Sequence, residues 1–171
     1  MKKRVKIYRT IVDNRNQNTK KSESYQSTDY IEVRFWGGKY DNCTWVDCRF
    51  TRSSFSNGMS LNGCNFIKCI FATAHTSLNA NFKKCLFEDC IFKATSFSGA
   101  FFEECKISGA MHDVVFYGRE AEPMMRTRLI KVDMSRVSFN MTDFQKKVDL
   151  ETTIFGYDCG TLLIEGKPIC E

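Results

Sequence analysis

The sequence has only two proline and two histidine residues in 171 positions. So few prolines exclude a proline-rich linker, and two histidines provide little for a histidine-based metal site. No apolar run approaches the roughly 20 residues that cross a membrane, since the most apolar stretch near the carboxyl end spans only residues 161–164. The basic amino terminus also lacks the apolar core of a secretory signal. We therefore expect a cytoplasmic protein in a reducing compartment, with its cysteines as thiols.

An excess of charge of one sign is also missing from most of the chain. The net charge is +5, but residues 1–29 alone carry eight basic and three acidic side chains, so the other 142 residues are balanced at 17 of each. We read residues 1–29 as a basic amino-terminal segment that is partly flexible. Nucleic-acid binding through this segment would be weak, because few aromatic residues are interleaved with its charges.

Phenylalanine and cysteine, by contrast, are abundant, with 15 and nine copies. Large apolar residues recur every five positions over much of the chain. They stand at Tyr30, Phe35, Tyr40, Trp45, Phe50, Phe55, Leu61, Phe66 and Phe71, and then at Phe82, Phe87, Phe92, Phe97, Phe102 and Ile107. A step of five rotates by about 140° on a helix and changes face on a continuous strand. To bury these residues together, the chain must turn once per repeat.

The cysteines indicate how many repeats make one coil. Small residues stand two positions before the large ones, and positions two apart on a short strand face the same way. Cys43, Cys64, Cys85 and Cys105 follow one another at 21, 21 and 20 residues, and Cys48, Cys69 and Cys90 at 21 and 21. Four segments of five residues, plus one at some corners, therefore form a square coil with two columns of thiols.

This pattern resembles the pentapeptide-repeat proteins, strongly over residues 30–112 and more weakly over residues 132–156. Their repeat has a small residue, often Asp or Asn next, then Leu or Phe, then two variable positions. Asn65 and Asn81 match this, whereas Ile70, Leu86 and Ile91 replace the polar residue. The resemblance implies an all-β fold, the right-handed quadrilateral β-helix, here with an interrupting loop and capped ends.

The boundaries of the remaining segments are predicted from where the five-residue period begins and ends. The solenoid is expected over residues 30–116, with a polar anchor at His112 where the ladder stops. Residues 117–131 have no five-residue period and predict a protruding loop or short helix. A further coil is expected over residues 132–156, through Met134, Phe139, Phe144 and Phe155, and a carboxyl-terminal cap over residues 157–171.

The sequence offers little for catalysis. Cysteines separated mostly by four residues do not have zinc-site spacing, and neither His75 nor His112 is placed beside a thiol. No nucleophile elbow, phosphate-binding loop or zinc-protease motif is present. We predict no enzyme activity, no metal and no cofactor.

The outward positions suggest a binding surface instead. Apolar residues collect on the two walls that carry the cysteines, and the interrupting loop adds methionines and arginines. The predicted partner-binding residues are Ile67, Ile70, Leu86, Ile91 and Met111 on the walls, and Met124, Met125, Arg126 and Arg128 in the loop. An alternative is that the amino-terminal segment or the loop folds over this apolar surface.

These observations predict a protein that binds another protein without catalysis and inhibits, protects or neutralises it, in the manner of an antitoxin or immunity protein. The resemblance gives one alternative, a DNA gyrase or topoisomerase partner of the quinolone-resistance type, although mimicry of DNA needs a strongly acidic surface. A third alternative is a structural rod that forms homo-oligomers, such as a homodimer, through its apolar wall.

Overall fold

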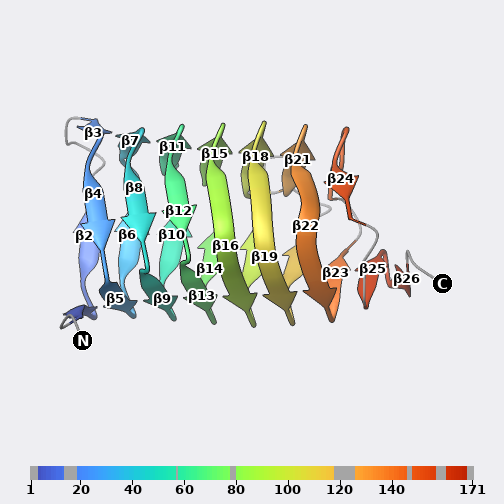
Figure 1. Cartoon of the computed structure of the whole chain (residues 1–171), viewed down its shortest axis with the longest axis horizontal. Coiled ribbons are helices and arrows are strands. Elements are labelled where there is room, and N and C mark those ends of the chain that lie inside the picture. The colour runs from blue at the N-terminus through green and yellow to red at the C-terminus, as the bar shows by residue number, and fades with distance from the viewer. Residues whose placement is uncertain are drawn as a thin grey trace.

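The structure, a computed structural model, describes residues 4–13, 19–56, 58–77, 80–117, 126–145, 148–156 and 161–168. Within these residues the chain forms a β-solenoid whose short strands stack in parallel on four walls (Figure 1). The described part contains no helix, and hence none that could span a bilayer.

Walls 1 and 2 belong to one continuous sheet, because three of its strands bend across the corner between them. Wall 1 contains β4 (Ser24–Gln26), β8 (Thr44–Val46), β12 (Asn65–Ile67), the first halves of β16 (Leu86–Lys93), β19 (Lys106–His112) and β22 (Asp133–Asn140), and β24 (Ile154–Phe155). Wall 2 contains β1 (Val5–Tyr8), β5 (Thr28–Ile31), β9 (Arg49–Thr51), β13 (Ile70–Ala72) and the second halves of β16, β19 and β22.

Walls 3 and 4 are separate sheets. Wall 3 contains β2 (Ile11–Asp13), β6 (Arg34–Trp36), β10 (Ser54–Ser56), β14 (His75–Ser77), β17 (Ser96–Ser98), β20 (Val115–Tyr117), β23 (Thr142–Phe144), β25 (Leu162–Ile164) and β26 (Lys167–Pro168). Wall 4 contains β3 (Lys20–Lys21), β7 (Lys39–Asp41), β11 (Ser60–Asn62), β15 (Asn81–Lys83), β18 (Phe101–Glu103) and β21 (Arg128–Ile130). All pairs are parallel except β25 with β26.

The five-residue period has a direct backbone cause. Three residues are extended, the next turns the corner in the left-handed region, and the fifth points inward as the small residue. Asp47, Lys68 and Asp89 are such corners, with φ of 51°, 53° and 51°. Cys48, Cys69 and Cys90 follow them and are fully buried.

The large residues form columns of stacked rings inside the coil. The Phe66 ring lies 4.7 Å from that of Trp45 and 4.8 Å from that of Phe87, both nearly parallel to it. The same offset stacking joins Phe50 to Phe71 at 4.9 Å. These distances match the rise between neighbouring strands, so ring stacking and strand pairing reinforce one another.

The two predicted thiol columns are confirmed, because residues 21 apart pair across neighbouring coils. Leu86 N–H donates to the Cys64 carbonyl at 2.9 Å, and Ile91 N–H to the Cys69 carbonyl at 2.9 Å. Each thiol also bonds to a backbone carbonyl of the coil before it, as Cys90 Sγ does to Phe66 C=O at 3.2 Å. The seven described cysteines are reduced and buried.

The structure extends beyond the range in which the five-residue period is clear. Strands begin at Val5, so residues of the basic amino-terminal segment build a first coil from β1, β2, β3 and β4. Of the expected interrupting loop, residues 118–125 lie outside the described residues, and Arg128 already belongs to β21. Residues 161–168 form the β25–β26 hairpin at the carboxyl-terminal end.

Candidate functional site

Four outward apolar side chains lie on walls 1 and 2, three of them beside the corner between these walls and Leu86 at the far edge of wall 1. Ile67 and Leu86 belong to wall 1, and Ile70 and Ile91 to wall 2, where they are direct partners in neighbouring strands. We call these four residues the apolar corner. Ile91 is 40% exposed, and the other three are partly exposed. The described amino-terminal residues form their own coil at the end of the rod and do not cover this surface.

Met111 does not belong to this surface, and its prediction as an outward residue is wrong. It is fully buried and pairs with Phe92 and Phe139 as the inward anchor of its segment. Ala110 takes the outward place beside Ile91. His112, predicted as a polar anchor, is instead the next outward residue and is partly exposed. The cause is the loss of one residue between Ile107 and Met111, which shifts the register.

The residues predicted in the interrupting loop are not brought to the apolar corner. Met124 and Met125 lie outside the described residues. Arg126 is exposed, and Arg128 projects from wall 4, with its guanidinium 5.1 Å from the centre of the Phe101 ring and 3.6 Å from Asp149. Arg128 therefore packs on the solenoid itself, on a different wall from the apolar corner.

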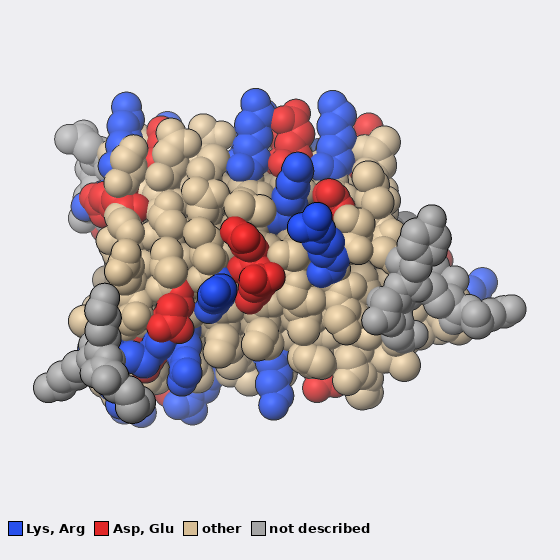
Figure 2. All heavy atoms as spheres, viewed as in Figure 1, with Lys and Arg blue, Asp and Glu red and all other residues tan. Residues whose placement is uncertain are grey.

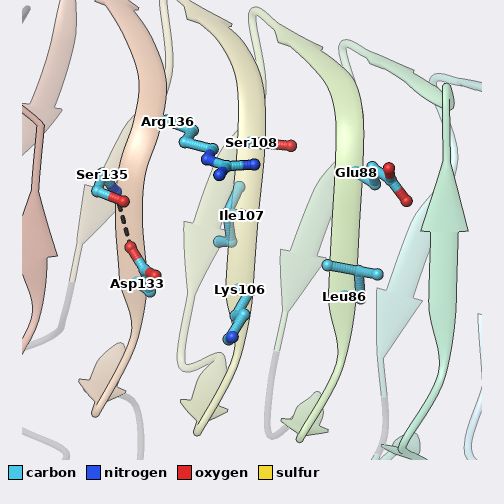
Figure 3. A pocket seen from close by; sticks show the side chains of 8 residues that line it. All are labelled: Leu86, Glu88, Lys106, Ile107, Ser108, Asp133, Ser135 and Arg136. Atoms are coloured by element: carbon cyan, nitrogen blue, oxygen red, sulfur yellow. Dashed lines mark hydrogen bonds between the residues drawn. The ribbon is translucent and has the colours of Figure 1, made fainter.

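The missing residue also creates a feature that the sequence interpretation overlooked. On β19 the single residue Ser108 lies opposite two residues of β16, Glu88 and Asp89. The next strand, β22, again has one residue more than β19 at this point. A hollow of about 380 Å³ lies at this point, which we call the notch. It is lined by Leu86, Glu88, Lys106, Ile107, Ser108, Asp133, Ser135 and Arg136 (Figure 3). The spacing of four between Ile107 and Met111 was its only signal in the sequence.

Charges of both signs surround the notch. Asp133 accepts a hydrogen bond from Ser135 N–H at 3.0 Å. The bonds with Ser135 hold the pKa of Asp133 below its usual range, and the nearby charges of Lys106 and Arg136 act in the same direction. Arg136 reaches from β22 toward Ser108 on β19 (Figure 3). The notch thus joins the apolar corner, through Leu86, to side chains that can bind a polar or charged group.

The surface around these features is weakly charged overall. Figure 2 shows that much of the face formed by β16, β19 and β22 is neither acidic nor basic, with acidic side chains near its middle and basic ones on both sides. On wall 4, Lys83 pairs with Glu103 at 2.9 Å, and the neighbouring Lys84 with Glu104 at 3.7 Å. Such pairs between coils balance the charge along the rod.

The basic amino-terminal segment is partly neutralised in the same way. Arg4 contacts Asp29 at 2.6 Å and Asp47 at 2.8 Å, and Arg9 contacts Glu32 at 2.6 Å. These arginines hold the first coil to the second. Their engagement reduces the positive charge available to a phosphate backbone.

The thiols are poorly placed for chemistry. A hydrogen bond with Cys69 and burial raise the pKa of the Cys48 thiol, and burial raises that of Cys43. Hydrogen bonds with Cys85 lower the pKa of Cys64 and Cys105, but both side chains are buried and out of reach of a substrate. A nucleophilic cysteine needs a lowered pKa and an adjacent base, whereas His75 is exposed on wall 3. Among the described residues, no group of three or more metal-ligating side chains is arranged to hold a metal ion.

Comparison with known proteins finds one family model and several solved structures. Residues 79–110 match the family model "Pentapeptide repeats" in eight copies. No curated protein sequence matches the chain. Solved structures that match include a trypsin-treated variant of QnrB1, a plasmid-mediated fluoroquinolone resistance protein, at 14% identity and a TM-score of 0.38, covering 97% of this chain and 84% of that one.

Two further solved structures are also similar. Full-length QnrB1 matches at 14% identity and a TM-score of 0.31, covering 90% of this chain and 92% of that one. HetL, a pentapeptide-repeat protein involved in heterocyst differentiation regulation in Nostoc sp. strain PCC 7120, matches at 12% identity and a TM-score of 0.16, covering 89% and 92%.

Proposed function

We propose that the chain, of which residues 79–110 match the pentapeptide-repeat family model, binds a protein partner through the apolar corner and acts without catalysis. The observation that carries this proposal is the pair Ile70 and Ile91, stacked outward on one wall with Ile91 40% exposed. Isoleucines at outward positions do not contribute to the core of the coil. Contiguous apolar side chains on a surface are typical of protein contacts.

The rigidity of the solenoid favours such binding. Every strand beneath the apolar corner is paired on both sides, and the rings of Phe66, Phe71 and Phe87 pack directly inside it. The four side chains are therefore held in place before the partner arrives. Little ordering entropy is lost on docking, so the apolar area buried contributes more fully to affinity.

The notch gives the surface a second, polar element. It lies beside Leu86 and is wide enough for one side chain of a partner. Lys106 and Arg136 can receive a carboxylate there, and Glu88 a basic group. An apolar patch with a polar recess at its rim is the usual arrangement of a specific protein interface.

The use of this binding would be to inhibit, protect or neutralise the partner, as antitoxin and immunity proteins do. Reduced, buried thiols suit a reducing compartment, so the proposal includes a cytoplasmic location. The predicted contribution of Met124, Met125, Arg126 and Arg128 remains part of this proposal as a separate contact. Arg126 and Arg128 are exposed but lie away from the apolar corner.

A second candidate is a DNA gyrase or topoisomerase partner. One observation favours it: Phe101 pairs with Arg128, 27 residues later, whereas Asn81 pairs with Phe101, 20 residues later, so this coil holds an insertion. A protruding loop is shared with some gyrase-protecting members of the family. The balanced charges of walls 1 and 4 do not favour it, because a mimic of DNA needs dense negative charge.

Two experiments test the proposal. Binding to the protein encoded beside this one, measured by calorimetry, should weaken about tenfold or more in Ile70→Asp and Ile91→Asp, because each puts a charge into the contact. The control Asn62→Asp adds the same charge to exposed wall 4 and should bind normally. Supercoiling by purified gyrase, with and without a quinolone, should be unchanged; protection would favour the second candidate instead.

A further inference from the structure

The first coil is an open rung at the amino-terminal end of the rod. β1 pairs with β5, β2 with β6, β3 with β7 and β4 with β8, and each of these four strands ends its ladder (Figure 1). Within the described residues no other strand pairs with their outer edges. All four walls therefore end in an edge at which further strands can be added.

The register of the inner coils shows which backbone groups this edge leaves unused. Thr44 N–H donates to the Glu23 carbonyl of the coil before it at 2.8 Å. Ser24 holds the same place one coil earlier, so its N–H points out of the open end. On wall 3, Arg34 donates its N–H to the first coil, and its partner Ile11 therefore also directs its N–H outward.

The core is open at the same end. Val5 occupies an inward position, paired with Thr28, yet is 59% exposed. Tyr25 stacks on Trp45 with ring centres 5.1 Å apart, and this column of rings ends there. In the inner coils, inward apolar side chains are covered by a coil on each side. In the first coil, the same positions are covered on one side only.

The opposite end is built differently. There β26 folds back antiparallel on β25, and its Pro168 has no backbone N–H to offer to a further strand. Such a hairpin is a common way to close a sheet edge. This hairpin covers wall 3 only, whereas at the amino-terminal end all four walls stop at an edge that no described strand pairs.

Ion pairs offset part of the positive charge at the open rung. Two described arginines of the first coil are held by carboxylates, Arg4 by Asp29 and Asp47 and Arg9 by Glu32. Lys20 lies 3.5 Å from Glu23. These pairs weaken the repulsion between two such ends, although residues 1–29 keep a net charge of +5.

We propose that two copies of the chain stack through their open first coils, about a two-fold axis perpendicular to the rod. An extended peptide could cover one wall, but only another square rung meets all four edges at once. The two-fold axis makes the contacting edges antiparallel, so Ser24 and Ile11 N–H groups gain carbonyl partners. The contact is closed, since a two-fold axis uses the same surface of both copies.

Sedimentation and small-angle X-ray scattering of the full chain test this proposal. We expect a concentration-dependent dimer whose longest dimension is nearly twice that of the monomer. Ser24→Pro and Ile11→Pro should each raise the dissociation constant at least about tenfold, since the symmetry removes two edge hydrogen bonds per substitution. Both keep the bonds to the second coil. Val5→Asp, which removes no hydrogen bond, should also dissociate the dimer.

Two control variants locate the contact. Ile154→Lys, at an exposed residue of the carboxyl-terminal end, and Ile91→Asp, in the apolar corner, should leave the dimer intact. A monomer at every concentration would overturn the proposal. So would a dimer that Ile91→Asp dissociates, or one no longer than the monomer, because both indicate side-by-side contact. A monomer would leave the proposed docking of a different protein at the apolar corner untouched, whereas a dimer that Ile91→Asp dissociates would place a second copy there.

Discussion

Gly109 lies against Cys90 so closely that a Cβ atom on Gly109 would overlap the Cys90 backbone carbonyl. The two residues are partners in neighbouring strands, and Gly109 has a φ of 117°. Here the second thiol column ends, because the shortened corner brings the backbone itself into the space that a side chain fills elsewhere. The same missing residue causes the register shift that buries Met111 and creates the notch.

Gly109→Ala should therefore destabilise the protein by about 3 kcal/mol or more, because the added methyl group meets backbone that cannot move aside. Gly58→Ala is the matched control, since it also has a positive φ, of 72°, but open space around it. It should cost only about 1 kcal/mol. Urea unfolding measures both, and equal losses would contradict the close approach.

The register shift makes a second prediction, on neighbouring apolar residues. Met111→Asp should unfold the solenoid or cost about 3 kcal/mol or more, because it buries an unpaired carboxylate. Ile91→Asp should change the free energy of unfolding by less than about 1 kcal/mol, since its side chain projects outward. Thermal melts compare the two variants. If Met111→Asp is tolerated, Met111 projects outward, as predicted from the sequence, and the register shift is wrong.

The corners offer a stabilising substitution. Thr73 is β-branched and sits at a φ of 48°, in the left-handed region that such residues avoid. Thr73→Asn should stabilise the protein by about 0.5–1 kcal/mol, because Asn tolerates this conformation. Thr51→Asn, on strand β9, should instead be slightly destabilising, because Asn is unfavourable in strands. A rise in urea midpoint for Thr51→Asn and not for Thr73→Asn would disprove the account of the corners.

The thiol columns predict a loss of stability in alkali. The hydrogen bond with Cys69 and burial raise the pKa of Cys48. For Cys69, a hydrogen bond with Cys48 lowers the pKa, but one with Cys90 and burial outweigh it and raise the pKa to about 12. The unfolded chain then binds fewer protons than the folded one above its thiol pKa of 9.0, so the free energy of unfolding falls as pH rises.

This dependence should be visible between about pH 8.5 and 9.5, below the range in which unfolded tyrosines ionise. The double variant Cys48→Ser with Cys69→Ser should show a shallower slope, because serine does not titrate. Urea unfolding at several pH values provides the measurement. A slope unchanged by the double substitution would show that other groups cause it.

Much of the fold was predictable because every repeat places one large and one small side chain inward and then turns a corner. The columns through Phe66 and Phe87, and the stacking of Cys43, Cys64 and Cys85, follow from residues 20 or 21 apart meeting in neighbouring coils. The first coil was harder to see. Its inward residues include Ile7 and Val12, and two such residues are too few to establish a period.

The candidate site was predictable only in part. Ile70 and Ile91 follow from the period, since outward positions are fixed once the inward ones are known. Met111 was misplaced because a one-residue deletion between Ile107 and Gly109 changes no large residue. A pattern of large residues at every fifth position does not reveal a corner that is one residue short, and the notch lies at that corner.

Site-specific photocrosslinking in living cells tests the docking surface most directly, because the crosslink itself captures the partner for identification. A photoreactive phenylalanine analogue at Ile91 should give a discrete adduct with a different protein, identified by mass spectrometry. The same analogue at Asn62, on wall 4, should give none. If neither position gives an adduct, or if both give the same one, the apolar corner is not the binding surface.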